Sequence, residues 1–284
     1  MNAHIVVATD GSAPAADAVR WASAEAARTR RPLRIVHVSG VWAYDRPTRS
    51  ALSAIEQVGE HERNILAEAA RLAREQAPGL AVDTAIVWGR VNIALQREAE
   101  HAELLVLGRH GHGLSAALRL GSAVTALAAR TPCPLVVVSG KPAEPFDEIV
   151  VGYDTRSAGD LDYAFAEAER RGARLRAIHA WAPPAFSPFT GGWPPLYTQM
   201  FENAQAEARR TLQPWRDKHP RVEVIEEAVC GGAAPALNAA SARADLVVVG
   251  ARRAILGSVT NGVLHGARCP VVVVQAAHAL AGAR

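Results

Sequence analysis

The stretch that decides the fold runs from Ala102 to Ser122: AELLVLG at 102–108, then Gly111 and Gly121-Ser122. The apolar run Leu104–Leu107 predicts a buried strand that ends at Gly108. Glycines follow it in the spacing G-x2-G-x9-G-S, and an apolar, helix-like stretch begins behind them. Glycines let backbone N–H groups approach an anion closely, and a helix start adds unpaired N–H donors. The order of strand, glycine loop and helix start therefore predicts a phosphate-binding loop.

The same segment recurs further along the chain. AELLVLG at 102–108 corresponds to ADLVVVG at 244–250, an offset of 142, and CPLVVV at 133–138 corresponds to CPVVVV at 269–274, an offset of 136. HIVVATD at 4–10 likewise matches EIVVGYD at 148–154, and LRIVH at 33–37 matches LRAIH at 175–179. Matched segments in one order indicate an internal duplication, and the second copy is shorter within the glycine loop.

Each copy alternates short apolar runs with longer amphipathic ones. Runs such as Leu135–Val138 are apolar on both faces, which is typical of parallel strands covered on both sides. The sequence predicts an α/β fold of two tandem doubly wound domains, residues 1–140 and 147–284, held in contact by the short connector between them. Strands are expected near 4–9, 33–38, 81–87, 103–107 and 134–138, and again near 148–153, 173–180, 222–229, 245–249 and 270–275. Helices are expected near 13–30, 50–77, 91–101 and 121–131, and one opens near Tyr197 behind a proline-rich surface loop or lid at 181–195.

Composition argues against several classes of function. The net charge of +3 is modest, and the arginines are dispersed, so we expect no nucleic-acid partner. There is no signal segment, and no apolar run approaches the length of a membrane span, so we expect a cytoplasmic chain without a membrane partner. Cys133, Cys230 and Cys269 are expected to be small reduced core residues rather than a disulfide or metal set.

The first strand ends at Asp10-Gly11-Ser12. In open α/β sheets, ligands bind beyond the carboxyl ends of the strands, where the strand order reverses. If the first and fourth strands are neighbours, Asp10 lies across from the glycine loop, and its carboxylate can accept hydrogen bonds from ribose or adenine donors. The alternative role is to cap the helix that begins near Ala13, for which Ser12 competes. We favour the ligand contact.

These features resemble the universal stress protein family in its tandem form. The resemblance rests on Asp10, on the second strand at Leu33–Val38, and on the complete glycine pattern ahead of TPCPLVVV at 131–138. It implies a five-stranded parallel sheet of order 3-2-1-4-5 in each domain, with ATP, with or without Mg²⁺, at the switch point. The implied contacts are Asp10 and the Val38 backbone to adenosine, and Gly108, Gly111, Gly121, Ser122 and the Ala123 N–H to the phosphates.

The second copy departs from this pattern. Gly250 and Gly257-Ser258 are retained, but Arg253 replaces the second glycine, and most of the loop is missing. Asp154 is retained, but Thr155 follows it in place of glycine. Arg252 and Arg253 could still pair with phosphate as charges. We expect one tight ATP per chain, in residues 1–140, and a degenerate second half.

The histidines do not indicate a metal or catalytic site. His110 and His112 are too few ligands for zinc, so they are interpreted as phosphate donors or exposed loop residues. His37 and His179 recur on the second strands and are interpreted as satisfied core histidines. The sequence has no Ser–His–Asp ordering, HExxH, CxxC or SGGxDS pattern, so we assign no catalytic residue and no metal site.

Three functional hypotheses follow. We favour a non-catalytic module in which bound ATP changes conformation or assembly, and so signals stress or energy state to a protein partner. The alternative is an enzyme, a slow ATPase or phosphotransferase, for which no water-activating base is evident. A scaffold that has lost its ligand is disfavoured by the complete glycine pattern.

The last strand of each copy is a candidate contact between the domains. Pro134–Val138 and Pro270–Val274 are strongly apolar, and open edges of that kind invite aggregation. The resemblance implies that they adjoin as antiparallel edge strands in an intramolecular pseudo-dimer. A homodimer of the whole chain is a further option.

Overall fold

The chain divides into two units, Met1–Pro142 and Ala143–Arg284, and the division falls within the predicted connector. The computed structural model describes residues 4–40, 49–111, 120–139, 145–154, 158–181, 194–251 and 256–275. The predicted proline-rich segment lies mostly outside these ranges, as do His112, Thr155, Arg252 and Arg253. Each unit is described by itself.

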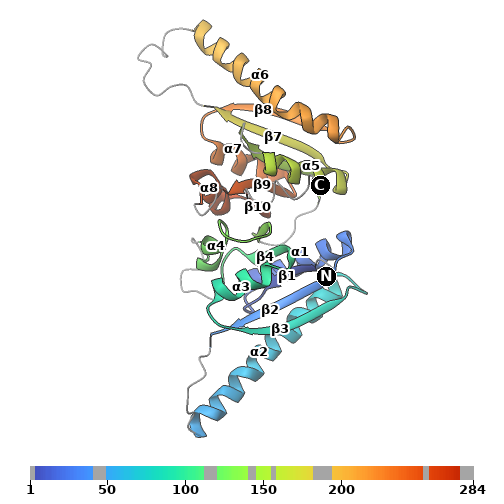
Figure 1. Ribbon diagram of the computed structural model, residues 1–284, viewed down its shortest axis with the longest axis vertical. Coiled ribbons are helices and arrows are strands. Elements are labelled where there is room, and N and C mark those ends of the chain that lie inside the picture. The colour runs from blue at the N-terminus through green and yellow to red at the C-terminus, as the bar shows by residue number, and fades with distance from the viewer. Residues whose placement is uncertain are drawn as a thin grey trace. The chain divides into compact units, whose positions relative to one another are not determined.

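Unit 1 is a parallel sheet with helices between its strands (Figure 1). Its strand order is β3-β2-β1-β4-β5. The strands are β1 (His4–Ala8), β2 (Leu33–Ser39), β3 (Val82–Trp88), β4 (Ala102–Gly108) and β5 (Leu135–Val138). The helices are α1 (Ala13–Thr29), α2 (Arg49–Gln76), α3 (Val91–Ala99) and α4 (Ser122–Leu127).

The crossovers of unit 1 cover both faces of the sheet. The first two step from β1 towards β3, and the next two run in the opposite direction, through β4 to β5. Because crossovers are right-handed, reversing direction moves the connecting helix to the other face. Accordingly α1 packs with α2, and α3 packs with α4. The reversal point lies between β1 and β4, where ligands bind in such folds.

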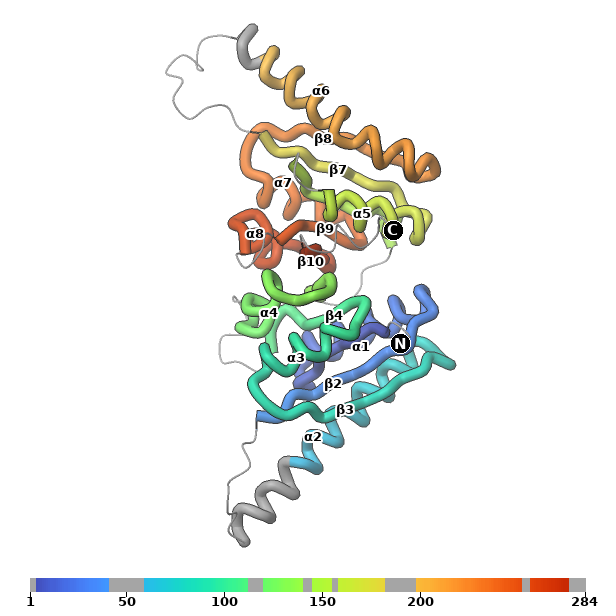
Figure 2. Tube along the Cα trace, viewed as in Figure 1, coloured from blue at the N-terminus to red at the C-terminus, as the bar shows by residue number. Residues whose placement is uncertain are grey.

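Unit 2 repeats this plan, as its trace in Figure 2 shows. Its strand order is β8-β7-β6-β9-β10, again the third, second, first, fourth and fifth strands of the copy. The strands are β6 (Glu148–Tyr153), β7 (Arg174–Trp181), β8 (Val224–Cys230), β9 (Leu246–Ala251) and β10 (Val271–Gln275). The helices are α5 (Ala158–Arg171), α6 (Pro194–Lys218), α7 (Ala233–Ala240), a 3₁₀ turn η1 (Ser241–Arg243) and α8 (Ser258–Gly266).

The α/β prediction is confirmed, including the 3-2-1-4-5 order within each unit. The predicted ends of the helices are less accurate. α4 ends at Leu127 rather than near residue 131, and Pro132 would in any case disfavour helical backbone at Thr131. α6 begins at Pro194, slightly before the predicted start at Tyr197.

The cysteines divide into two kinds. Cys133 and Cys269 are buried, as predicted, and burial raises the pKa of each thiol to about 12. Cys230 is exposed, so its assignment to the core is wrong. It is the last residue of β8, an edge strand of its unit, where the side chain is not covered.

Unit 2 contains a buried carboxylate that two arginines hold. Glu148 is 2% exposed at the start of β6, and its oxygens accept from Arg174 Nε at 2.6 Å and from Arg176 Nε at 2.7 Å. Burial raises the pKa of Glu148, but the hydrogen bonds from Arg176 and Arg174 outweigh it and hold the pKa below the usual value of 4.5. The folded state therefore stabilises the ionised carboxylate.

This pair predicts a pH dependence of stability. The folded-state pKa of Glu148 is depressed, so its contribution is complete above the unfolded pKa and is lost as pH falls through the folded value. We expect Glu148→Gln to lower the free energy of unfolding at pH 7 by about 1–2 kcal/mol, less than for a fully buried pair because both arginines are partly exposed. As pH falls through the folded-state pKa of Glu148, the two proteins should converge. Acid titrations of thermal unfolding check this against Glu100→Gln, an exposed control, and equal effects of the two variants would contradict it.

Candidate functional site

The turn after β1 brings Asp10 to the reversal point. Ser12 caps α1, since its Oγ accepts from the Ala15 N–H at 3.3 Å. Asp10 Oδ1 instead accepts from the Ser12 N–H at 3.0 Å, and Gly11 adopts a φ of +81° between them. Capping, one of the two roles that the sequence left open for Asp10, therefore belongs to Ser12. The hydrogen bond from the Ser12 N–H holds the Asp10 carboxylate in position within the turn.

Gly108, at the end of β4, and Gly111 lie in close contact with the segment that follows β1. A Cβ on Gly108 would lie 2.7 Å from the carbonyl carbon and oxygen of Pro14, in the first turn of α1. A Cβ on Gly111 would lie 2.2 Å from Asp10 Oδ2. At Gly108 the close neighbour is backbone, so only glycine fits there, whereas at Gly111 a Cβ would have to displace the Asp10 carboxylate.

The two ends of the glycine loop are hydrogen-bonded to each other and to β5. The Arg109 N–H donates to the Val138 carbonyl at 3.0 Å, and the Gly121 N–H donates to the Arg109 carbonyl at 2.9 Å. Residues 112–119, between these ends, lie outside the described part of the chain. The bonds fix where the loop leaves and re-enters the sheet.

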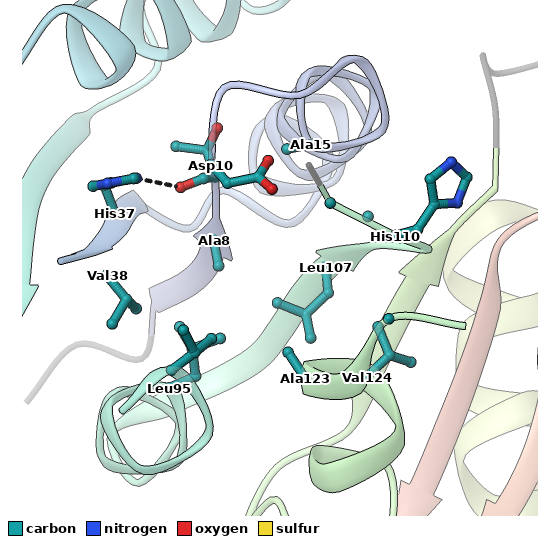
Figure 3. Close-up of a pocket in the computed structure, with 15 residues that line it drawn as sticks. Ala8, Asp10, Ala15, His37, Val38, Leu95, Leu107, His110, Ala123 and Val124 are labelled. Carbon is teal, nitrogen blue, oxygen red and sulfur yellow. Dashed lines mark hydrogen bonds between the residues drawn. The ribbon is translucent and has the colours of Figure 1, made fainter. Parts of the chain in front are cut away.

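A cavity of about 140 Å³ lies at this point (Figure 3). Six predicted site residues line it: Asp10, Val38, Gly108, Gly111, Gly121 and Ala123. The seventh, Ser122, is exposed as the first residue of α4 and is not among the lining residues. Gly121 is the N-cap residue of α4, and no side chain caps this helix.

The apolar wall of the cavity was missed by the sequence analysis. Val91 and Leu95 of α3 and Leu107 of β4 line it together with Val124. In Figure 3, Leu95, Leu107 and Ala123 lie together opposite the Asp10 carboxylate. The predicted strand order could have indicated this wall, because it carries α3, the helix that leads into β4, across the reversal point between β1 and β4.

His37 lines the cavity and is not only a residue of the core. Its Nδ1 donates to the Thr9 carbonyl at 2.8 Å, the bond drawn in Figure 3. Its Nε2 lies 3.9 Å from Oε1 of Glu62, a buried carboxylate of α2. The prediction that the His37 ring is hydrogen-bonded is correct. The same hydrogen bond holds Thr9, the residue before Asp10, in position.

His110, the loop histidine that the structure describes, is not part of a metal-ligand cluster among the described residues. No group of three or more His, Cys, Asp or Glu side chains with metal-binding geometry occurs in the ranges that the structure covers. His110 lines the cavity, and its ring points away from the Asp10 carboxylate (Figure 3).

Comparison with known proteins decides the family. A sequence model of the universal stress protein family matches the chain twice, at residues 1–139 and 145–275. The chain belongs to the universal stress protein family. It is a tandem member, because each unit carries one match.

Relatives of the whole chain carry the same description. A universal stress protein of Mycobacterium tuberculosis is 32% identical over 290 residues, which cover 95% of this chain and 96% of the relative. A second one from that organism is 30% identical over 305 residues, covering 96% and 95%. A universal stress protein of Archaeoglobus fulgidus shares the fold at a TM-score of 0.67 and 17% identity, with 96% of each chain covered. One from Pseudomonas aeruginosa does so at 0.60 and 17%, with 98% and 96% covered.

Among the described helices, none combines the length and apolar character that crossing a bilayer requires.

The contact at Gly108 predicts a stability effect. Gly108→Ala places a methyl group against the Pro14 backbone, which cannot rotate away, so we expect a loss of about 1–3 kcal/mol in the free energy of unfolding. Gly40→Ala is the control, because among the described residues other than its chain neighbours no atom lies within 4 Å of a Cβ there. Urea unfolding measures both variants, and equal stability of the two would contradict the close approach.

Proposed function

We propose that unit 1 binds ATP in the cavity between β1 and β4, and that the protein is a cytoplasmic, nucleotide-responsive regulatory module of stress or energy signalling without robust catalysis. The observation that carries the proposal is the convergence of the Asp10 carboxylate with Gly108, Gly111 and Gly121 at the reversal point. The free cysteines are consistent with a reducing compartment.

The cavity offers different chemistry at its two ends. Asp10 supplies acceptor oxygens for ribose or base donors, and the side chains of Val91 and Leu95 supply an apolar surface for a flat ring. Gly111, Gly121 and Ala123 supply backbone without a bulky side chain, where N–H groups can meet phosphate oxygens. A Cβ at Gly111 would fill the space beside Asp10. These residues fit a nucleotide that lies with its nucleoside towards Asp10 and its phosphates towards the glycine loop.

The same geometry favours binding over catalysis. Phosphoryl transfer needs a positioned base, and usually a metal-holding carboxylate, near the γ-phosphate. Among the described residues lining the cavity, Asp10 is the one carboxylate, and it is hydrogen-bonded to the Ser12 N–H at the proposed nucleoside end. The alternative of a slow ATPase or phosphotransferase is tested by phosphate release from Mg-ATP. Turnover well above that of the Asp10→Ala variant would favour the enzyme.

We also propose that β5 and β10 adjoin as antiparallel strands in an intramolecular pseudo-dimer. β5 follows β4 at one end of the strand order of unit 1, and β10 follows β9 at one end of that of unit 2. Both are short strands made of apolar residues apart from Gln275, and apolar strands are prone to aggregate as open edges. A homodimer of whole chains would use other surfaces.

The loop assignment predicts the effect of two substitutions on ligand-induced stabilisation. At an ATP concentration one hundred times Kd, the wild type should gain about 2.7 kcal/mol. Gly111→Val should abolish most of this gain, because its side chain displaces the Asp10 carboxylate. Ser122→Ala should reduce the gain by less and cost under about 1 kcal/mol of basal stability, because Ser122 is exposed. Thermal shift measures both effects, and undiminished gains in both variants would remove the site from unit 1.

The proposed stoichiometry is one tight ATP per chain. Calorimetric titration should give one site for the wild type. Asp10→Ala should weaken ATP binding at least about tenfold, the effect of losing one hydrogen bond to a charged or buried group. Asp154→Ala, the matched change in unit 2, should leave the tight site unchanged. Two equivalent sites would contradict this stoichiometry, and loss of binding in Asp154→Ala with Asp10→Ala silent would assign the working half to unit 2.

The pseudo-dimer predicts slow amide exchange along the outer edge of β5. In a paired strand every backbone N–H of Leu135–Val138 is protected, whereas in an open edge strand alternate amides face water. Hydrogen–deuterium exchange resolved at single residues checks this in the full chain. Fast exchange at alternate residues would rule out the pairing.

A further inference from the structure

A buried carboxylate of unit 1 lies beside a residue that lines the cavity. Glu62 of α2 is 4% exposed, and its Oε1 lies 3.9 Å from Nε2 of His37. Its other oxygen, Oε2, is buried without a hydrogen-bond partner in the described part of the chain. A buried ionised carboxylate is costly unless a positive charge compensates it. The nucleotide contacts proposed above give this carboxylate no role.

The hydrogen bond to Thr9 decides which protonation state of His37 suits Glu62. Nδ1 donates to the Thr9 carbonyl, so in a neutral ring Nε2 carries a lone pair. That lone pair would face the ionised Glu62 carboxylate, and neither group could donate a hydrogen bond to the other. One proton on the pair removes this conflict. An imidazole is a stronger base than a carboxylate, so the proton belongs on Nε2 and makes the ring an imidazolium.

Among the described side chains of the elements packed on β2, Glu62 is the titratable group that faces His37 Nε2. The Asp10 carboxylate, after β1, points away from the His37 ring, and His110 lies on the far side of the cavity (Figure 3). On β3, the residue in register with His37 is Ile86, which carries no charge. Charged residues of α1 and α3 near β2 form pairs of their own, Asp17 with Arg20 and Glu98 with Arg34.

Unit 2, whose own strand ends enclose a cavity of about 470 Å³, has the histidine but carries alanine at the position of the carboxylate. The ends of α2 and α6, and those of β3 and β8, are related by the offset of 142. The same offset places Ala204, which is buried, at the position of Glu62. Nδ1 of His179, the counterpart of His37, lies 3.3 Å from the Tyr153 carbonyl, against 2.8 Å for the bond in unit 1. Hydrogen bonds from charged donors are the shorter ones, so the shorter bond agrees with a protonated His37.

We propose that Glu62 is a positioning residue of the nucleotide site, which acts by keeping His37 protonated. The imidazolium binds the Thr9 carbonyl with one nitrogen and faces Glu62 with the other, and so fixes the residue before Asp10. Loss of the proton makes this side of the cavity more negative by one charge, whatever the fixed charges around it, and this disfavours an anionic ligand. Nucleotide affinity therefore falls as pH rises and His37 loses its proton. This coupling rests on the proposed function, whereas the proton on the pair does not.

Nitrogen NMR of the ligand-free full chain tests the proton. Near pH 7, both ring nitrogens of His37 should be protonated in the wild type, and Nε2 should be unprotonated in Glu62→Gln. Loss of the signals in His37→Gln assigns them. Glu62→Ala, which copies unit 2, is the second variant if Glu62→Gln folds poorly. A neutral His37 in the wild type overturns the proposal.

ATP titrations of the full chain between about pH 6 and about pH 9 test the coupling. Comparing the Kd values of wild type and Glu62→Gln at each pH removes the ionisation of ATP and of His110, which both proteins share. Over this range the wild type should lose at least about threefold more affinity than Glu62→Gln. Glu68→Gln is the matched control, because Glu68 lies on the same helix but is exposed and pairs with Arg71. It should keep the wild-type profile.

The two measurements separate this proposal from the proposed function. Equal pH profiles of ATP affinity in the wild type and Glu62→Gln would overturn the positioning role, as would an equal loss of pH dependence in Glu68→Gln. A wild-type chain that binds no ATP would contradict the proposed function and the coupling with it. The nitrogen signals would still decide whether Glu62 keeps His37 protonated.

Discussion

The contact on which unit 1 depends is the approach of α1 to the end of β4. Gly108 has no Cβ, so the Pro14 backbone packs directly on the strand, and this packing brings the turn after β1 next to the glycine loop. Asp10 then reaches Gly111, and Ser12 is left to cap the helix. With a larger residue at Gly108, the two loops would separate, and the cavity between them would lose one wall. The contact between Gly108 and Pro14 therefore packs the helix on the sheet and also forms the site.

Most of the fold could be predicted because the signals are local and repeated. Apolar runs covered on both faces identify the parallel strands, and the duplication checks each assignment against its copy. Helix ends were less predictable, as α4 shows, because the helix stops at Leu127 although Ala128 and Ala129, good helix formers, follow it. The exposure of Cys230 was not predictable from its own neighbours, since it depends on β8 being an edge strand.

The candidate site shows the same division between local and tertiary information. The glycine spacing and Asp10 were evident in the sequence, because few other residue types can replace a glycine or a carboxylate at these strand ends. The wall formed by Val91 and Leu95 was not, since apolar residues on a helix look alike whether they face a core or a cavity. The position of Glu62 beside His37 is still less evident, because a glutamate within a long amphipathic helix is ordinary in itself.

The contrast among the three thiols makes the chain convenient for spectroscopy. Thiol-reactive dyes attack the thiolate, and the raised pKa values and burial of Cys133 and Cys269 keep both protonated and shielded at neutral pH. Cys230 is exposed at the carboxyl end of β8, and the cavity of unit 2 lies at the carboxyl ends of the same sheet. A single fluorophore can therefore be attached to the unmodified protein without removing a native cysteine, at a position that reports on unit 2 rather than on unit 1.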